Sequence, residues 1–184
     1  MTQADLAALD RLLLERSVKR GHFVLASGRT SNFYVDCRLT TMSAEGLVLI
    51  GKLGLEAIRD AGWAPRSVGG LTMGADPVAY AVAARSVAAQ PIVDAFSVRK
   101  EAKAHGTGRR VEGNFAAGDQ VVVVEDVITT GGSALKAIEA VREEGGTVLG
   151  ILAVVDREEG GRATLEAAGH KVVALTTASR LGLK

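Results

Sequence analysis

The sequence has little of what stabilises small disulfide-rich or zinc-bound folds. Its 184 residues include one cysteine, Cys37, which excludes an intramolecular disulfide and any cysteine-based zinc cluster. A lone thiol fits a reducing compartment, and we expect the protein in the cytoplasm. Net charge is also small, because 22 Lys and Arg against 21 Asp and Glu leave +1. A nearly neutral chain argues against generic nucleic-acid binding, so we expect no nucleic-acid partner.

Long hydrophobic runs are missing as well. No apolar stretch reaches the roughly 18 residues that a membrane-spanning helix requires. The segment from Met1 to Leu14 carries Asp5 and Asp10 early and has no apolar block, which is unlike a signal peptide. We therefore expect neither a signal peptide nor a membrane partner.

Glycine, in contrast, is abundant, with 22 residues against a usual share of about 7%. The glycines cluster where predicted loops meet predicted helices. From residue 67 onward, segments with the pattern of strands alternate with segments that have the pattern of helices. Strands are expected at 67–71, 91–98, 120–125, 147–155 and 171–175, and helices at 76–89, 133–144 and 161–169.

Two of these strands are apolar on both faces. Val121–Val124 and Ile151–Val155 are continuous apolar runs rather than alternating ones. Such runs are typical of a parallel sheet that helices cover on both sides. The sequence therefore predicts an α/β fold with an open, doubly wound, mostly parallel sheet flanked by helices. Ligands of such sheets bind at the carboxyl ends of the strands.

The residues before 67 have a different pattern. Their elements are expected at 4–20 (helix), 23–25 and 33–35 (strands), and from Ser43, as N-cap, to about Ala61 (helix). Gly21 is the expected cap at the end of the first helix. We expect a single domain over 1–184, with the N-terminal helix and a small segment, here called the hood, in 1–40. The α/β core follows in 41–184, with a mobile loop at 99–110.

The most informative segment joins a strand, a loop and a helix. It reads Val121-Val122-Val123-Val124-Glu125-Asp126-Val127-Ile128-Thr129-Thr130-Gly131-Gly132-Ser133. A helix N-terminus offers unpaired N–H groups to an anion, glycines let the backbone wrap closely around it, and the hydroxyl groups add donors. The two carboxylates suit the vicinal hydroxyl groups of a sugar, or a magnesium ion. Together these features predict a site for ribose 5-phosphate.

A plainer interpretation is a strand that ends in solvated acids before an ordinary Ser-capped helix. The acids and the glycine loop occur together at the end of a parallel strand, which favours the ligand site. The segment is not a P-loop, because it lacks the Gly-x-x-x-x-Gly-Lys-Ser/Thr pattern. No Gly-x-Gly-x-x-Gly follows a strand, so a dinucleotide site has no support.

A second segment, 99–110, is strongly basic. It reads Arg99-Lys100-Glu101-Ala102-Lys103-Ala104-His105-Gly106-Thr107-Gly108-Arg109-Arg110. Two glycines and the absence of an apolar period predict a flexible loop. Its composition fits either a lid that closes over a polyanion or a solvated charged hairpin.

Five segments together resemble a known enzyme family. Segment 121–133 resembles the phosphoribosyl-diphosphate-binding motif of type I phosphoribosyltransferases, with four apolar residues, two acids and a Thr/Gly loop. The string Arg-Lys-x-x-Lys-x-His-Gly at 99–106 resembles the catalytic loop of the orotate phosphoribosyltransferases. Residues 25–36 resemble that family's hood motif, and 69–77 resemble its diphosphate loop, which often holds a strained peptide bond. Residues 155–157 match the position of an arginine that meets the orotate carboxylate.

The resemblance implies a reaction and a set of site residues. The implied reaction transfers the 5-phosphoribosyl group from 5-phosphoribosyl 1-diphosphate to orotate, giving orotidine 5′-phosphate and diphosphate in pyrimidine biosynthesis. The implied catalytic residues are Arg99, Lys100, Lys103 and His105. The implied donor-binding residues are Thr72, Met73, Glu125, Asp126, Val127, Ile128, Thr129, Thr130, Gly131, Gly132 and Ser133. The implied orotate-binding residues are Tyr34, Val35, Thr129 and Arg157.

The resemblance also implies a cofactor and an assembly. Mg²⁺ would be held mainly by the substrate, with Asp126 contacting it through water and no side chain ligating it directly. In this family the catalytic loop closes over the active site of the neighbouring subunit. A homodimer with shared sites is therefore implied.

Two departures from the family pattern concern positive charge. Many members have a lysine where this chain has Ala26, and many have Tyr-Lys where this chain has Thr72-Met73. Two cationic contacts to the donor are therefore missing. Either Arg29 or the 99–110 loop compensates, or the diphosphate is bound differently.

Two rival functions fit part of the pattern. A phosphoribosyltransferase for another base, such as a purine, would have the same 121–133 segment, but the hood and the 99–106 string favour orotate. A non-catalytic sensor of phosphoribosyl diphosphate that regulates transcription would need a basic face for DNA. The net charge of +1 argues against that sensor.

Overall fold

The computed structural model describes residues 2–24, 30–101 and 109–184. Within them, six strands form one sheet in the order β5-β4-β3-β6-β7-β8. All neighbours in this sheet pair in parallel except β4 and β5, which are antiparallel. The strands are β3 (Ser67–Leu71), β4 (Asp94–Val98), β5 (Val111–Gly113), β6 (Gln120–Ile128), β7 (Thr147–Asp156) and β8 (Val172–Thr177).

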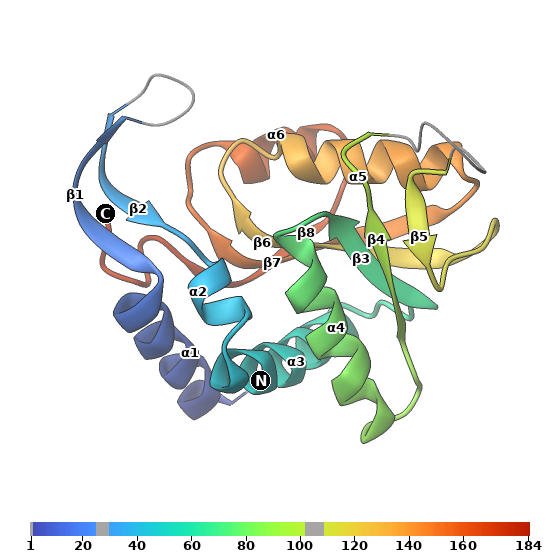
Figure 1. The fold of residues 1–184 in the computed structure, drawn as a ribbon, viewed down its shortest axis with the longest axis horizontal. Coiled ribbons are helices and arrows are strands. Elements are labelled where there is room, and N and C mark those ends of the chain that lie inside the picture. The colour runs from blue at the N-terminus through green and yellow to red at the C-terminus, as the bar shows by residue number, and fades with distance from the viewer. Residues whose placement is uncertain (1, 25–29, 102–108) are drawn as a thin grey trace.

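Helices cover both faces of this sheet (Figure 1). The helices are α1 (Gln3–Arg16), α2 (Arg38–Thr41), α3 (Ala44–Asp60), α4 (Ala75–Val87), α5 (Gly132–Glu143) and α6 (Gly161–Ala167). Side chains of α1, α3 and α4 pack in one hydrophobic cluster, and those of α5 and α6 pack in the other. The predicted doubly wound, mostly parallel α/β fold is confirmed.

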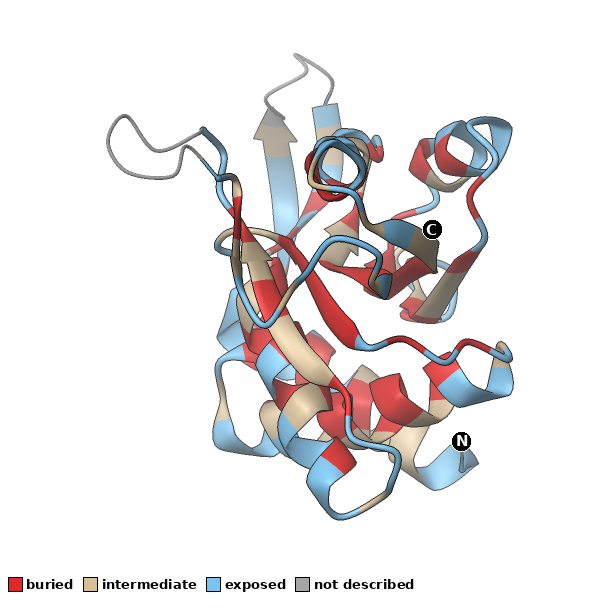
Figure 2. Cartoon of the chain, turned by 90° about the vertical axis from the view of Figure 1, so that its right-hand side faces the viewer, coloured by how far each residue is buried: buried red, intermediate tan, exposed pale blue. Residues whose placement is uncertain are grey.

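Strand β6 shows why both faces of the sheet are apolar. Val122 and Val124 belong to the cluster under α3 and α4, whereas Val121 and Val123 belong to the cluster under α5. All four side chains are fully buried, and buried residues line the middle of the sheet in Figure 2. Each such side chain contributes about 1.5–3 kcal/mol relative to an exposed one, so this part of the strand anchors the acids at 125 and 126.

The sheet has a topological switch point between β3 and β6. The chain leaves β3 through α4 toward β4, and leaves β6 through α5 in the opposite direction toward β7. The loops after β3 and β6 therefore diverge, and they leave a crevice at the carboxyl ends of these two strands. The segment with the acids and glycines, 121–133, begins in β6 and so lies at this crevice.

The hood is an antiparallel hairpin of β1 (Val18–Val24) and β2 (Thr30–Val35), which stands beside the main sheet in Figure 1. The prediction of a helix over 4–20 was wrong at its end, because α1 stops at Arg16. Val18, Lys19 and Arg20 instead pair with β2, and this cross-strand pairing overrides a weak helical pattern. Gly21 is therefore no helix cap and lies at the register shift of the hairpin.

Other boundaries also differ from the predicted ones. Strand β6 continues to Ile128 rather than ending at Glu125, so both acids lie inside the strand. Glu125 pairs with Ala153 of β7, and Asp126 lies between Glu125 and Val127, which pairs with Val155. Helix α2 and strand β5 were not predicted, since four and three residues are too short to show a period. Ser43 caps α3 as predicted, accepting a hydrogen bond from the N–H of Gly46 at 3.1 Å.

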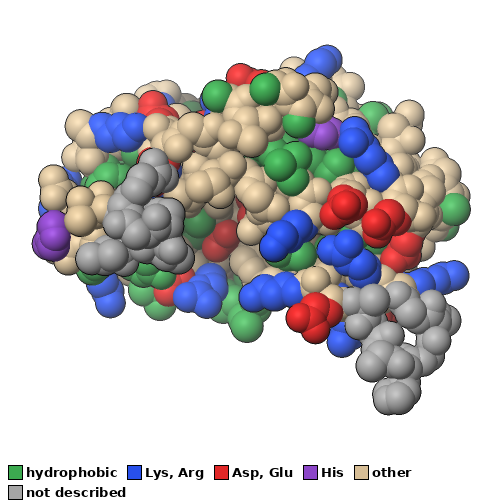
Figure 3. All heavy atoms as spheres, turned by 90° about the horizontal axis from the view of Figure 1, so that it is seen from above, with side chains coloured by type: hydrophobic (Ala, Val, Ile, Leu, Met, Phe, Trp, Pro, Cys, Tyr) green, Lys and Arg blue, Asp and Glu red, His purple; other side chains and the backbone are tan. Residues whose placement is uncertain are grey.

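Charges are mixed on the surface that Figure 3 shows, where basic and acidic side chains lie side by side. None of the helices in the described ranges is long and apolar enough to cross a membrane.

Candidate active site

A cavity of about 330 Å³ lies at the carboxyl ends of β3 and β6. It combines the acidic part of β6, the loop after β3, the last residues of the hood and the start of the 99–110 segment. Its lining residues are Tyr34, Val35, Asp36, Cys37, Arg38, Leu71, Thr72, Met73, Gly74, Lys100, Glu125, Asp126, Val127 and Ser133. Nine of the predicted site residues, from four separate parts of the sequence, therefore face one space: Tyr34, Val35, Thr72, Met73, Lys100, Glu125, Asp126, Val127 and Ser133.

The two acids have different environments within β6. Glu125 is 5% exposed, and its Oε1 has no hydrogen-bond partner among the described residues. Burial, and the neighbouring charge of Asp126, raise the pKa of Glu125 to about 8. Glu125 is therefore mostly protonated at neutral pH, and it can both donate and accept a hydrogen bond.

Asp126 is held more firmly. Its Oδ1 accepts a hydrogen bond from the N–H of Val127 at 2.8 Å. Burial raises the pKa of Asp126, while the hydrogen bonds from the backbone and the charge of Arg38 act in the opposite direction. The pair thus offers one orphaned buried carboxyl and one oriented carboxyl to the cavity, a suitable set for two sugar hydroxyl groups.

A smaller hollow of about 80 Å³ adjoins the acids at the start of α5. Gly131 caps this helix with φ +83°, a left-handed conformation that favours glycine. A Cβ there would also come within 3.0 Å of Leu165. The lining residues are Glu125, Val127, Ile128, Thr129, Thr130, Gly131, Gly132, Ser133 and Ala134. The hollow shares Glu125, Val127 and Ser133 with the larger cavity, so a phosphate here would lie next to a sugar there.

The loop after β3 closes the other side of the cavity. Its Thr72–Met73 peptide bond is cis, and the N–H of Thr72 donates to the carbonyl of Val98 at 2.8 Å. Gly74 allows this loop to approach β6, because a Cβ at that position would lie 2.6 Å from Oδ1 of Asp126. The backbone of the loop, rather than a basic side chain, is what faces the acids here.

A backbone hydrogen bond joins the two described ends of the 99–110 segment. The N–H of Arg99 donates to the carbonyl of Arg110 at 2.8 Å, and β4 and β5 pair on either side. Lys100 lines the cavity, whereas the guanidinium of Arg99 lies 3.6 Å from Glu112. The predicted catalytic residues Lys103 and His105 lie outside the described residues, as do Ala26 and Arg29.

Arg157, the predicted contact for the orotate carboxylate, lies buried beside the cavity rather than in its lining. Its Nη2 is 2.7 Å from Oε1 of Glu159 and donates to Oγ of Ser31 at 3.4 Å. The guanidinium also stacks over the ring of Phe33, 4.8 Å from its centre. Nε has no partner among the described residues. Strand β2 of the hood thus holds the arginine, and Glu159 balances its charge.

Sequence reasoning missed the turn after β2. Asp36, Cys37 and Arg38 line the cavity, and Arg38 is joined to Asp36 by two short contacts. Cys37 itself is buried, and burial raises the pKa of its thiol well above the ordinary range. The sequence did contain a signal for this turn. Asp36 and Arg38 stand two residues apart directly after the strand that the hood motif places near the site.

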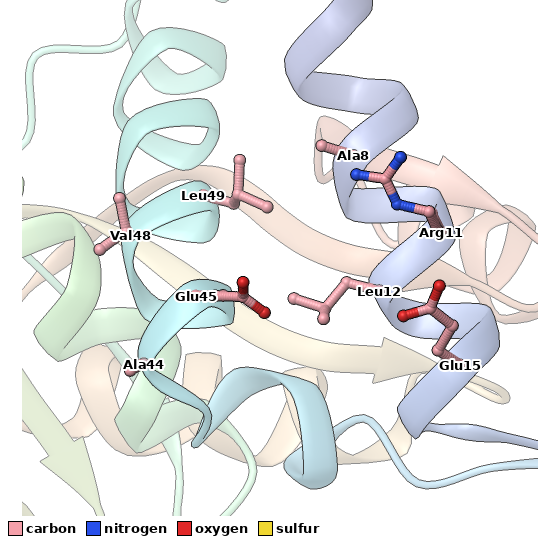
Figure 4. A pocket seen from close by; sticks show the side chains of 8 residues that line it. All are labelled: Ala8, Arg11, Leu12, Glu15, Ala44, Glu45, Val48 and Leu49. Carbon is pink, nitrogen blue, oxygen red and sulfur yellow. The ribbon is translucent and has the colours of Figure 1, made fainter.

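Larger hollows lie elsewhere on the molecule. One of about 600 Å³ separates α1 from α3, where Leu12 and Leu49 face each other between charged side chains (Figure 4). Another of about 500 Å³ lies between α3 and α4 and contains Val48 and Tyr80. Neither lies at the carboxyl ends of the strands, and neither contains the acids or the glycine loop, so the smaller polar cavity is the candidate active site.

Comparison with known proteins agrees with this geometry. The phosphoribosyl transferase domain family matches residues 43–172. The orotate phosphoribosyltransferase of Aquifex aeolicus is 45% identical, with 98% of this chain and 100% of that protein covered. The crystal structure of Mycobacterium tuberculosis orotate phosphoribosyltransferase in complex with Fe(III) dicitrate is 45% identical, with a TM-score of 0.86 over 97% of this chain and 99% of that one. The same Mycobacterium enzyme in complex with 5-phospho-α-D-ribosyl 1-diphosphate has a TM-score of 0.82 and 41% identity over 97% and 99% of the two chains.

The doubly wound sheet, the acids of β6 and the glycine loop before α5 form the arrangement expected of a domain that binds a phosphorylated ribose at a switch point. The chain belongs to the phosphoribosyltransferase family, and within it to the orotate phosphoribosyltransferases.

Proposed function

We propose that this protein transfers the 5-phosphoribosyl group from 5-phosphoribosyl 1-diphosphate to orotate, giving orotidine 5′-phosphate and diphosphate. The observation that carries the proposal is the convergence of three parts on two adjoining hollows: the acids of β6, the loop before α5 and the end of the hood. The similarity to orotate phosphoribosyltransferases over nearly the whole chain supports the choice of acceptor. Because Cys37 is a free thiol, we propose that the reaction takes place in the cytoplasm.

The donor fits the cavity in one direction. The 5-phosphate takes the backbone N–H groups and hydroxyl groups from Thr129 to Ser133, at the positive end of α5. The ribose hydroxyl groups then meet Glu125 and Asp126, and the diphosphate extends toward Thr72, Met73 and Lys100. This order follows from the shared border of the two hollows.

The reaction needs charge stabilisation more than a nucleophilic side chain. A ring nitrogen of orotate, which gives up its proton, bonds to C1 of the ribose while the bond from C1 to the diphosphate oxygen breaks and its electron pair leaves with the diphosphate. Positive charge develops on the ribose ring and negative charge on the leaving group. Asp126 and Lys100 line the cavity, where Asp126 faces the first charge and Lys100 neutralises the second. Arg99, Lys103 and His105 of the same segment are the further residues that we propose for this role.

Orotate occupies the hood side of the cavity. Tyr34 and Val35 present the end of β2 to the pyrimidine, and Thr129 lies between the base and the phosphate. The orotate carboxylate pairs with Arg157, whose guanidinium already faces the carboxylate of Glu159. Binding therefore requires the arginine to share or exchange its acidic partner.

The residues present fit Mg²⁺ as the cofactor. This ion usually keeps several waters and is bound by one or two carboxylates together with substrate phosphates. Asp126 faces the cavity, Glu125 has an orphaned oxygen, and no group of three or more metal-ligating side chains occurs among the described residues. We propose that the ion would be held mainly by the substrate, with Asp126 contacting it through water. When bound, it neutralises charge on the diphosphate.

We also propose a homodimer with shared active sites. The surface of α2, α3 and α4 carries several exposed apolar side chains, and apolar patches of this kind mark interfaces. The exposed apolar side chains on this surface are Leu39, Met42, Val48, Tyr80 and Val87. We propose that in this dimer the 99–110 segment of one subunit acts at the cavity of the other. Sedimentation should give a dimer, and an active monomer would contradict this assembly.

The mixed charge on the face that Figure 3 shows supports an enzyme rather than a sensor that binds DNA.

The test is to incubate the protein with the donor, Mg²⁺ and, separately, orotate, uracil, adenine, guanine or hypoxanthine, and to identify the nucleotides formed. We expect orotidine 5′-phosphate from orotate and no product from the others. Product from a purine instead would keep the donor site and discard the orotate assignment. Absence of any product, together with salt-dependent binding to DNA, would favour the sensor.

A further inference from the structure

Arg38 is a basic side chain of the cavity to which the mechanism above gives no role. It is the first residue of α2, directly after the hood strand that holds Tyr34 and Val35. Its side chain is 48% exposed and lies among the lining residues, together with Met73, Lys100 and Asp126. Among the described residues of this lining, Arg38 and Lys100 are the basic ones.

The guanidinium of Arg38 is fixed in place by Asp36. Nε of Arg38 donates to Oδ1 of Asp36 at 2.8 Å, and Nη2 donates to Oδ2 at 2.9 Å. The backbone N–H of Arg38 also donates to Oδ1 at 3.2 Å, and the N–H of Asp36 donates to the carbonyl of Ser17 at 2.9 Å. A two-point contact of this kind fixes the orientation of the plane and leaves the donors of Nη1 for another partner.

Arg38 also acts on the acid that is expected to hold the ribose. Burial raises the pKa of Asp126, and the charge of Arg38 acts in the opposite direction. The pKa of Arg38 is raised mainly by its hydrogen bond to Asp36, and Asp126 adds to this. Both residues line the same cavity. A ligand that contacts Asp126 with its ribose and extends beyond it passes near the guanidinium.

The charge of the cavity calls for such a contact. Asp36 and Asp126 are acidic, whereas Glu125 is mostly protonated at neutral pH, and a diphosphate adds several negative charges to the same space. The loop after β3 offers Thr72 and Met73, which carry no charge. The single positive charge of Lys100 cannot balance the combined negative charge of these acids and the diphosphate.

We propose that Arg38 binds the diphosphate of the donor substrate, opposite Lys100, and that Asp36 positions it for this contact. The inference rests on the proposed function, since it names a further residue of the same site. It also accounts for the absence of a basic side chain at Met73, because the turn after β2 supplies the charge from the other side of the cavity.

Binding of inorganic diphosphate tests the proposal without requiring catalysis. Calorimetric titration of the full chain with diphosphate and Mg²⁺ compares the wild type with Arg38→Gln, Arg38→Lys and a matched control, Arg66→Gln. Arg66 is also an exposed arginine paired with an aspartate, at 2.6 Å from Asp94, but it lies at the opposite end of the sheet. We expect Arg38→Gln to weaken diphosphate binding at least tenfold, Arg38→Lys to weaken it less, and Arg66→Gln to leave it within twofold.

Steady-state kinetics add a readout that a purely structural role would not give. Arg38→Gln should raise KM for 5-phosphoribosyl 1-diphosphate at least tenfold and leave KM for orotate within twofold. Asp36→Asn should weaken diphosphate binding in the wild type but not in Arg38→Gln, because it acts through the arginine. Since Arg38 is half exposed, its removal leaves no cavity in the core.

The outcomes separate this inference from the proposed function. Unchanged diphosphate binding in Arg38→Gln, with an active wild type, overturns the role of Arg38 and leaves the function standing. Loss of orotate binding with normal diphosphate binding also overturns it. A wild type that binds diphosphate through Arg38 but converts no orotate would overturn the proposed reaction and keep the contact.

Discussion

Replacing Glu125 with glutamine should change how the stability of the ligand-free protein depends on pH. Glutamine has nearly the same shape as the protonated acid but cannot ionise. The ordinary pKa of 4.5 is raised to about 8 by burial and by Asp126. At about 1.4 kcal/mol per pH unit, ionising Glu125 in the folded state costs about 4 to 5 kcal/mol more than ionising it in the unfolded state.

The sign follows from proton counting. Between pH 4.5 and about 8 the folded protein holds a proton on Glu125 that the unfolded chain has lost. Its contribution to stability is therefore complete below pH 4.5, falls as the pH rises, and is gone above about pH 8. The glutamine variant lacks this dependence, so it should become more stable relative to the wild type as the pH increases.

The assay is urea denaturation of both proteins at a fixed protomer concentration from pH 5 to pH 9. The difference in unfolding free energy between wild type and Glu125→Gln should change by about 3 to 5 kcal/mol over this range, in favour of the variant at high pH. Glu139→Gln is the control, because Glu139 is an exposed carboxyl on α5. A difference that stays flat between pH 5 and pH 9 would show that Glu125 is ionised in the folded protein and would refute the reasoning.

Three further predictions concern the site and its support. Lys103→Ala should lower kcat far more than it changes orotate binding, and near-normal turnover would remove Lys103 from the catalytic role. Gly74→Ala should raise KM for the donor by about tenfold or more with little change in Tm. The new Cβ would lie 2.6 Å from Oδ1 of Asp126, so the carboxylate would have to move; an unchanged KM would contradict this. Val122→Ala should lower the free energy of unfolding by about 2 kcal/mol in urea titrations, since the side chain is fully buried, and a loss below about 0.5 kcal/mol would contradict that packing.

The sequence was most informative where local pattern and burial coincide. Strand β3 has the predicted bounds, Ser67–Leu71, and Val121–Val124 are buried on both faces as their continuous apolar run indicates. The acids and the glycine loop were placed at the crevice by the same argument, because the end of a parallel strand fixes where a following loop lies.

Features that depend on distant contacts could not be predicted in this way. Val18–Arg20 continue a helical pattern but pair with β2, a contact that only the folded hairpin supplies. The position of Arg157 between Glu159 and the ring of Phe33 likewise joins the end of β7 to the hood. Arg38 was missed because its importance arises from the cavity across from it, not from its neighbours in sequence.

The central claim is that the cavity at the ends of β3 and β6 transfers phosphoribose to orotate. The most direct measurement follows the ultraviolet absorbance of orotate in the presence of 5-phosphoribosyl 1-diphosphate and Mg²⁺, with wild type and Asp126→Asn in parallel. We predict loss of orotate only when both donor and metal are present, and a rate at least a hundredfold lower in Asp126→Asn. Stable orotate absorbance in the wild type, or an equally fast loss in Asp126→Asn, would contradict the account.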